Sequence, residues 1–154
     1  MYDRGQEPSA IISARISMDT DRIFRIPALR IAEAHQRAGG STRVYQFAWR
    51  GNAFGGRLGA GHGVEVPFVF DDFSPPMTQA MMGDDVPDGL TEKMHGSWVS
   101  FAADGDPAAT GVVPPWPQYE PKSRPTMVFG ERTAVMADPD GERRASCDDV
   151  PLPR

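Results

Sequence analysis

The chain has 154 residues, of which 40% are hydrophobic and 24% charged, as in an ordinary soluble globular domain. Its formal net charge of −5 and its lack of a basic stripe exclude nucleic acid as a partner, and no apolar run is long enough to cross a membrane. The 16 glycines and 15 prolines commit many residues to turns, so we expect a modest core. The single cysteine, Cys147, excludes an internal disulfide and is expected to be an incidental thiol in a polar tail.

The first 18 residues do not resemble a secretory signal, because charged side chains stand where an apolar segment belongs. Taken as written, the chain would be cytoplasmic. A longer protein carrying a signal further upstream would show the same pattern, so the location stays open.

The first predicted helix follows Asp21. Because proline is tolerated only in the first turn of a helix, Pro27 places the start near Phe24 to Ile26, with Asp21 as an N-cap if the start is slightly earlier. Gly39-Gly40 is expected to end it. Its apolar residues recur at helical spacing: Ile23, Ile26, Leu29 and Ala32.

Residues Arg43 to Trp49 form the strongest predicted strand. Aromatic side chains alternate with Val44, Gln46 and Ala48, so both faces are largely apolar. A strand buried on both faces belongs in a central or well-covered position of a sheet. The chain offers few partner strands, which is a first indication that part of the sheet is missing.

Arg50 to Gly63 is predicted to be a glycine-rich loop, of the kind that often covers an active site. Residues 59–63 lack the lysine of a P-loop and the spacing of a dinucleotide fingerprint, so phosphate binding is not expected. The apolar run Val64 to Phe70 contains Pro67, which argues against a central strand and favours a short helix or a buried extended segment.

A second helix is predicted from Leu90 to Ala103, after an irregular segment over residues 73–87. Asp88 is its expected cap, and residues 104–107 end it. Its apolar stripe, expected to pack in the core, consists of Leu90, Met94, Trp98 and Phe101.

Beyond Pro107 the chain is predicted to be mostly turns. Residues 127–129 and 133–136 are expected to pair as a hairpin around Gly130-Glu131. One domain is expected over residues 1–154, in which residues 139–154 are a polar tail.

Three histidines are candidate catalytic residues. His35 lies late in the first predicted helix and His95 lies off the main stripe of the second, so position assigns neither a role. His62 lies between Gly61 and Gly63, in a loop that follows a buried strand, where an imidazole is suited to general base catalysis. Spacing alone still favours an ordinary hydrogen-bonded loop histidine.

Other catalytic groups are sparse. His62 and Glu65 have the i, i+3 spacing of two metal ligands on a helix, but no third ligand stands out, so neither a metal nor a cofactor is expected. The sequence has no Gly-x-Ser-x-Gly elbow and no His-Gly-Gly oxyanion loop. Ser41 and Ser97 each follow a glycine without the second glycine, and Ser97 falls inside the second predicted helix. The chain offers a base without a nucleophile.

Residues 59–70, Gly-Ala-Gly-His-Gly-Val-Glu-Val-Pro-Phe-Val-Phe, are the most specific stretch of the sequence. Shorter motifs flank it in order between about Asp19 and Asp138. Together they resemble the type B carboxylesterases, the α/β-hydrolase family of bacterial para-nitrobenzyl esterases and cholinesterases. The flanking motifs are Thr20-Asp21, Phe24, Pro27, Ala32-Glu33-Ala34, Val44-Tyr45 and Phe47, then Leu90, Met94, Trp98, Phe101-Ala102, Gly105, Pro107, Trp116-Pro117, Tyr119, Arg124, Met127-Val128-Phe129 and Asp138-Pro139.

The resemblance implies an α/β fold: the C-terminal fragment of an α/β-hydrolase, with two main helices, one buried strand and a short C-terminal hairpin. It implies that His62 is the triad histidine, a general base toward the serine and then a general acid toward the leaving alcohol. In this family the serine and the acid precede the histidine, so both would lie before Met1, as would the oxyanion glycines. Glu65 matches an acidic family position but is not the triad acid, and is expected to organise the loop with Gly61 and Gly63.

The implied function is hydrolysis of small carboxylic esters by a serine esterase to which this chain supplies the histidine. The isolated chain is expected to be inactive. Two alternatives stay open: a non-catalytic binding module, because one fold hosts unrelated functions, and a fragment that complements a separate serine-bearing chain. An exposed sheet edge would favour association with another chain. Neither a nucleic acid nor a membrane partner is expected.

Overall fold

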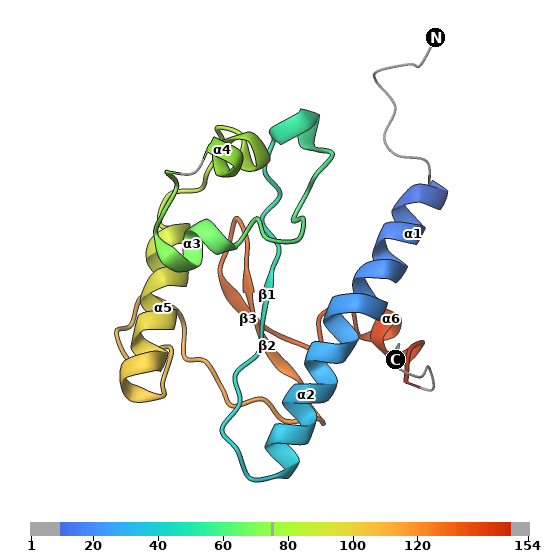
Figure 1. Ribbon diagram of the computed structural model, residues 1–154. Coiled ribbons are helices and arrows are strands. Elements are labelled where there is room, and N and C mark those ends of the chain that lie inside the picture. The colour runs from blue at the N-terminus through green and yellow to red at the C-terminus, as the bar shows by residue number, and fades with distance from the viewer. Residues whose placement is uncertain (1–9, 75, 149–154) are drawn as a thin grey trace. The chain divides into compact units, whose positions relative to one another are not determined.

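The computed structural model describes residues 10–74 and 76–148 (Figure 1). They form two compact units: the first unit comprises residues 10–42 and 139–148, and the second comprises residues 43–138. None of the helices in these ranges is long and apolar enough to span a bilayer. The elements are α1 (Ala10–Thr20), a π-helical turn (Asp21–Arg25), α2 (Ile26–Arg37), β1 (Tyr45–Phe47), a 3₁₀ turn (Ala53–Gly56), α3 (Val66–Phe70), α4 (Pro76–Met82), α5 (Leu90–Asp104), β2 (Pro125–Phe129), β3 (Ala134–Ala137) and α6 (Gly141–Ala145).

The chain enters the second unit after Thr42 and leaves it after Asp138, where the polar tail was predicted to begin. Residues 139–148 of that tail carry α6 and belong to the first unit. Residues 149–154 lie outside the described ranges. The division of the whole protein into domains stays a prediction.

The first unit is built on one continuous helix, because α1, the π-helical turn and α2 follow one another without a break. The α-helix α2 begins at Ile26, within the predicted range, but the chain was not expected to be helical already before it, and the π-helical turn explains how the two helices join. The Ile26 N–H donates to the Asp21 carbonyl five residues earlier, so the turn is wider than an α-helical one. This wider turn directly precedes Pro27, whose ring and missing N–H would otherwise break an α-helix. The predicted end is confirmed: the helix ends at Arg37, and Gly39 follows with φ +84°.

Asp21 is buried inside this helix and is not the N-cap that the sequence suggested. Its carboxylate oxygens lie 2.8 Å from Nε of Arg25 and 2.8 Å from Nε of Arg143, and its side chain is 3% exposed. A buried carboxylate needs such cationic partners to offset the loss of hydration. Because Arg143 belongs to α6, this cluster attaches residues 139–148 to the long helix.

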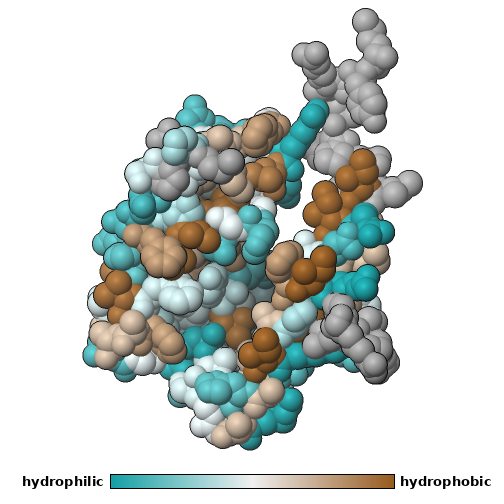
Figure 2. Space-filling model, viewed as in Figure 1, coloured by the Kyte–Doolittle hydropathy of each residue, from teal (hydrophilic) through white to brown (hydrophobic). Residues whose placement is uncertain are grey.

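The long helix also has a strip of apolar surface. Figure 2 shows a line of hydrophobic side chains along α1 and α2. The exposed large hydrophobic residues of this helix are Ile12, Ile16, Met18, Ile23, Phe24 and Ile31.

The second unit contains a sheet of three strands in the order β1-β2-β3. β1 pairs in parallel with β2, with Tyr45 opposite Met127 and Phe47 opposite Phe129. β2 and β3 pair antiparallel, so the predicted C-terminal hairpin is confirmed. The strand predicted over residues 43–49 is shorter than expected. It is half-buried rather than buried on both faces, because β1 is an edge strand of the described sheet.

Helix α5 confirms the second predicted helix but corrects its buried face. Leu90 and Met94 are buried, whereas Trp98 and Phe101 are 47% and 41% exposed. The buried face continues through Ser97 and Ser100 instead, one position earlier in each turn. The predicted cap at Asp88 was also wrong, because Gly89 with φ +71° precedes the helix and no side chain caps it.

The core of the second unit is an aromatic cluster centred on Phe68 of α3, which is fully buried. Its ring centroid lies 5.4 Å from that of Phe47, 5.5 Å from that of Trp49 and 5.4 Å from that of Phe73. The short helix predicted around Pro67 is thus confirmed, and it packs on α5 (Figure 1). The segment 73–87, expected to be irregular, contains α4.

Candidate active site around His62

The loop that leads to His62 is closed at its base. Gly51 and Gly59 form an isolated antiparallel bridge, so residues 52–58 form a closed loop. Gly51 is required there, because a Cβ would collide with the Met82 carbonyl oxygen and with the Trp49 ring. Asn52 connects this closed loop to the segment after α4: its Nδ2 donates to Oδ1 of Asp84 at 2.7 Å, and its Oδ1 accepts from the Asp84 N–H at 3.2 Å.

His62 occupies the corner of a tight turn. The Val64 N–H donates to the Gly61 carbonyl at 3.2 Å, which places His62 and Gly63 at the two central positions. Gly63 has φ +84° and His62 does not have a positive φ, the combination of a type II turn, whose second central residue is best filled by glycine. The predicted glycine loop is therefore confirmed, and Gly63 has a definite conformational reason to be glycine.

The turn presents the imidazole outward while the backbone after it is anchored. His62 is exposed, whereas Val64, two residues later, is 2% exposed and belongs to the core. Because residues 62–65 form turns rather than a helix, His62 and Glu65 do not share the helical face that a two-ligand metal site would need. Within the described ranges, no group of three His, Cys, Asp or Glu side chains could hold a metal ion.

Glu65 joins the turn to α3 and lies close to Tyr45 of β1. Its carbonyl accepts hydrogen bonds from the N–H groups of Phe68 at 3.0 Å and Val69 at 3.1 Å, which begins the helix. Burial raises the pKa of the Tyr45 hydroxyl above its ordinary value of 10.0, and the negative charge of Glu65 raises it further, while a hydrogen bond with Trp98 acts in the opposite direction. The Tyr45 ring is held edge-on against Trp98 and Phe129. Sequence reasoning did not single out Tyr45, because its approach to Glu65 depends on the packing of β1 against the loop.

The other two histidines have different surroundings. His35 is exposed, and its Nδ1 lies 2.8 Å from the Thr42 hydroxyl in the first unit. His95 is partly buried, and its Nδ1 lies 2.9 Å from the Val69 carbonyl oxygen. Position alone assigned His95 no role, because a contact between residues 26 positions apart leaves no local signature.

The serines do not form a nucleophile elbow. Ser97 lies in the middle of α5, as predicted, and is 2% exposed. Its hydroxyl has no hydrogen-bond partner among the described residues. A nucleophile elbow instead presents its serine on a strained turn between a strand and a helix. Cys147 is a partly exposed free thiol in the first unit.

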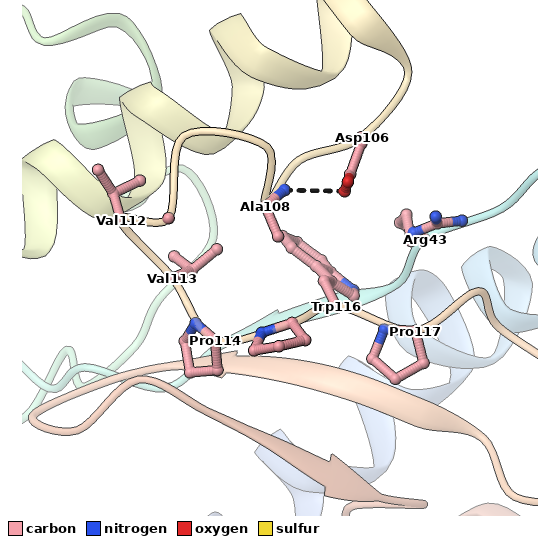
Figure 3. A pocket seen from close by; sticks show the side chains of 10 residues that line it. Arg43, Asp106, Ala108, Val112, Val113, Pro114, Trp116 and Pro117 are labelled. Carbon is pink, nitrogen blue, oxygen red and sulfur yellow. Dashed lines mark hydrogen bonds between the residues drawn. The ribbon is translucent and has the colours of Figure 1, made fainter.

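A concavity of about 870 Å³ lies elsewhere in the second unit (Figure 3). It is formed by Arg43, just before β1, and by residues of the segment 106–117. Asp106 and Arg43 are the charged residues in its lining, while Trp116 and neighbouring prolines and valines supply apolar surface. The lining contains no histidine, serine or cysteine, so this concavity does not contribute to the chemistry considered for His62.

Comparison with known proteins identifies the family of the chain. The sequence profile described as "Carboxylesterase family" matches residues 1–147. The chain is 29% identical over 141 residues to the para-nitrobenzyl esterase of Bacillus subtilis, covering 86% of this chain and 27% of that protein. It is 27% identical over 137 residues to the phenmedipham hydrolase of Pseudarthrobacter oxydans, with the same two coverages.

A solved structure shows the same fold. The crystal structure of a carboxylesterase from Geobacillus stearothermophilus matches 92% of this chain and 29% of its own, with a TM-score of 0.75 and 30% identity. The chain thus spans between a quarter and a third of the length of these relatives. The helices and small sheet described above are part of an α/β esterase fold, and this chain belongs to the carboxylesterase family.

Proposed function

We propose that this chain supplies the histidine of a serine carboxylesterase, with His62 as the general base and acid. The observation that carries the proposal is the position of His62: an exposed imidazole at the corner of a turn whose following residue is buried in the core. A catalytic base must reach a substrate-bound group while its backbone stays fixed. Gly61 and Gly63 shape the turn, and Glu65 begins the helix that anchors it.

In the proposed reaction, the His62 imidazole accepts the proton of a serine hydroxyl as that oxygen attacks the carbonyl carbon of a carboxylic ester. The imidazolium then donates the proton to the departing alcohol. A water molecule, activated by the same imidazole, hydrolyses the acyl-enzyme and releases the acid. The serine comes from a segment outside this sequence, because the sequence contains no Gly-x-Ser-x-Gly. The family resemblance implies that the triad carboxylate and the oxyanion donors come from that segment as well.

The exposed edge of β1 is the proposed attachment point for that segment. The Val44 carbonyl accepts from Met127, and the Ala48 N–H donates to Phe129, so these groups face β2. In a parallel ladder the backbone groups alternate in direction, and those of Tyr45 and Phe47 therefore face the opposite edge. A strand added there would extend the sheet and continue the fold that the relatives share.

The experiment is reconstitution. The chain is co-expressed with the serine-bearing N-terminal portion of the Bacillus subtilis para-nitrobenzyl esterase, and p-nitrophenyl ester hydrolysis is measured. We expect activity from the pair and background rates from either part alone. His62→Ala in the pair should lower kcat by a factor on the order of 10⁶, as for loss of a triad histidine. His35→Ala, which removes a histidine of the first unit, is the matched control and should leave the rate unchanged.

Three results would contradict the proposal, the first of which is background activity from the unmodified pair. Equal activity of the His62→Ala and unmodified pairs would remove His62 from the reaction. Hydrolysis by the purified chain alone, abolished by His62→Ala, would show that the chain contains its own nucleophile.

A further inference from the structure

Helix α3 receives a hydrogen bond from a second histidine at its C-terminal end. His95 of α5 places Nδ1 2.9 Å from the Val69 carbonyl oxygen. A carbonyl oxygen accepts but cannot donate, so Nδ1 must carry the proton of this bond. The structure thereby specifies the tautomer of His95: in the neutral ring, Nδ1 is protonated and Nε2 is not.

This bond satisfies a carbonyl that the short helix cannot satisfy by itself. The last four carbonyls of an α-helix lack partners within the helix, and α3 has only five residues. The Pro67 carbonyl accepts from the N–H groups of Asp71 and Asp72 just beyond the helix. The Val69 carbonyl is bonded instead to a side chain of α5, so His95 acts as a C-terminal cap supplied by another element.

The hydrogen bond from His95 constrains the orientation of α3, which the apolar contacts of Phe68 do not do by themselves. Phe68 holds α3 in the core through apolar contacts, which have no preferred bonding direction. A hydrogen bond constrains both distance and angle. Residue Val69 connects this constraint to the turn, because its N–H donates to the Glu65 carbonyl at 3.1 Å and its carbonyl accepts from His95. Glu65 is three residues after His62.

We infer that His95 is a positioning residue for His62: it holds α3 in one rotational setting, and α3 holds the turn that presents the imidazole. The catalytic consequence rests on the function proposed above, whereas the tautomer and the local ordering do not. His35 provides the matched comparison, because it also bonds a nearby oxygen through Nδ1 but lies in the other unit.

The first test uses the full chain labelled with ¹⁵N-histidine. With three histidines in the sequence, a long-range ¹H–¹⁵N spectrum at mildly alkaline pH resolves each ring, and single variants assign them. We expect His95 to be the Nδ1–H tautomer. A neutral His95 protonated at Nε2 could not donate to Val69, and that result would overturn the inference.

The second test replaces His95 by asparagine or by glutamine, whose side-chain amide nitrogens stand in for Nδ1 and Nε2 of the imidazole, respectively. In His95→Asn, the side-chain amide nitrogen superposes on Nδ1 and still reaches Val69, whereas in His95→Gln it superposes on Nε2 and does not. We expect amide exchange over residues 64–70 to be roughly fivefold faster in His95→Gln, as for the loss of one net hydrogen bond, and nearly unchanged in His95→Asn. Equal protection in both variants would contradict a directional role for His95.

The third test measures kinetics in the reconstituted esterase. His95→Gln should lower kcat by about tenfold with little change in KM, because a misplaced base slows the chemical step rather than ester binding. His95→Asn should restore most of the rate. Rates are divided by the concentration of active sites, so that a smaller folded fraction is not mistaken for slower chemistry. If the unmodified pair is inactive, the proposed function fails, while the tautomer and exchange measurements still decide the positioning role.

Discussion

The two units of this chain are stabilised in different ways. Among the described residues, all but two of the buried hydrophobic side chains belong to the second unit, where most of them form one core cluster that includes Phe68. In the first unit those two are Ile26 and Ala32, and the most buried side chain is the carboxylate of Asp21, paired with two arginines. One unit is therefore held by apolar burial and the other by a cluster of charges.

This difference bears on where a catalytic residue can be placed. Apolar cores are close-packed and hold neighbouring backbone rigidly, whereas a cluster of ion pairs constrains mainly the groups that it joins. His62 lies between the core residues Trp49 and Val64 in the sequence, in the well-packed unit. Its loop can then be long and rich in glycine without being loose, because both of its ends are buried.

The largest expected effect tests the apolar unit. Phe68→Ala removes a fully buried ring and should lower the free energy of unfolding of the second unit by about 3–5 kcal/mol. Phe70→Ala is the matched control, because Phe70 lies in the same helix and is 70% exposed. It should change stability by less than about 0.5 kcal/mol. Urea unfolding followed by tryptophan fluorescence measures both. Similar losses in the two variants would show that α3 is not anchored as described.

The next effect tests the charge cluster. Asp21→Asn removes the buried carboxylate shared by Arg25 and Arg143 and leaves them only the more exposed Asp140, so it should lower the stability of the first unit by about 3 kcal/mol. Amide exchange over α1 and α2 measures the local loss. Asp19→Asn breaks only the exposed pair with Arg15 and should leave exchange unchanged. If Asp21→Asn destabilised residues 43–138 to the same extent, the two units would unfold as one and the contrast between them would fail.

The smallest effect concerns pH. The pKa of Tyr45 is raised in the folded chain, so its contribution to stability is complete below the ordinary value of 10.0 and is lost as the pH rises through the higher folded value. The second unit should therefore lose stability above about pH 10, and Tyr45→Phe should lessen that loss. Tyrosinate absorbance measures the pKa of Tyr45, and alkaline unfolding measures the loss of stability with rising pH. Glu65→Gln should lower the tyrosine pKa, and an unchanged titration would show that Glu65 does not act on Tyr45.

The elements whose formation depends on residues close in sequence were predictable from the sequence. The existence of the two main helices, the C-terminal hairpin, the short helix at Pro67 and the glycine loop around His62 all follow from periodicity, turn residues and glycine. These signals are short in range, because helical spacing and turn geometry involve residues within a few positions of one another. The loop around Gly61, His62 and Gly63 was found in this way, whereas the role of His62 as a base was implied only by the family resemblance of residues 59–70.

The corrections all arise from contacts between distant residues or from helix geometry that spacing does not reveal. A π-helical turn carries the long helix past Pro27, and the packing of α5 buries Ser97 where the sequence suggested Trp98. Asp21 meets Arg143 across 122 positions.

What the sequence alone determined is the identity and local shape of the His62 loop, because glycine conformations and turns are set by adjacent residues. What only the tertiary structure decided is how that loop is held: Phe68 in the core, Tyr45 beside Glu65, and His95 on the Val69 carbonyl. Each of these contacts joins elements that the chain separates, and no local pattern records which element will lie against which.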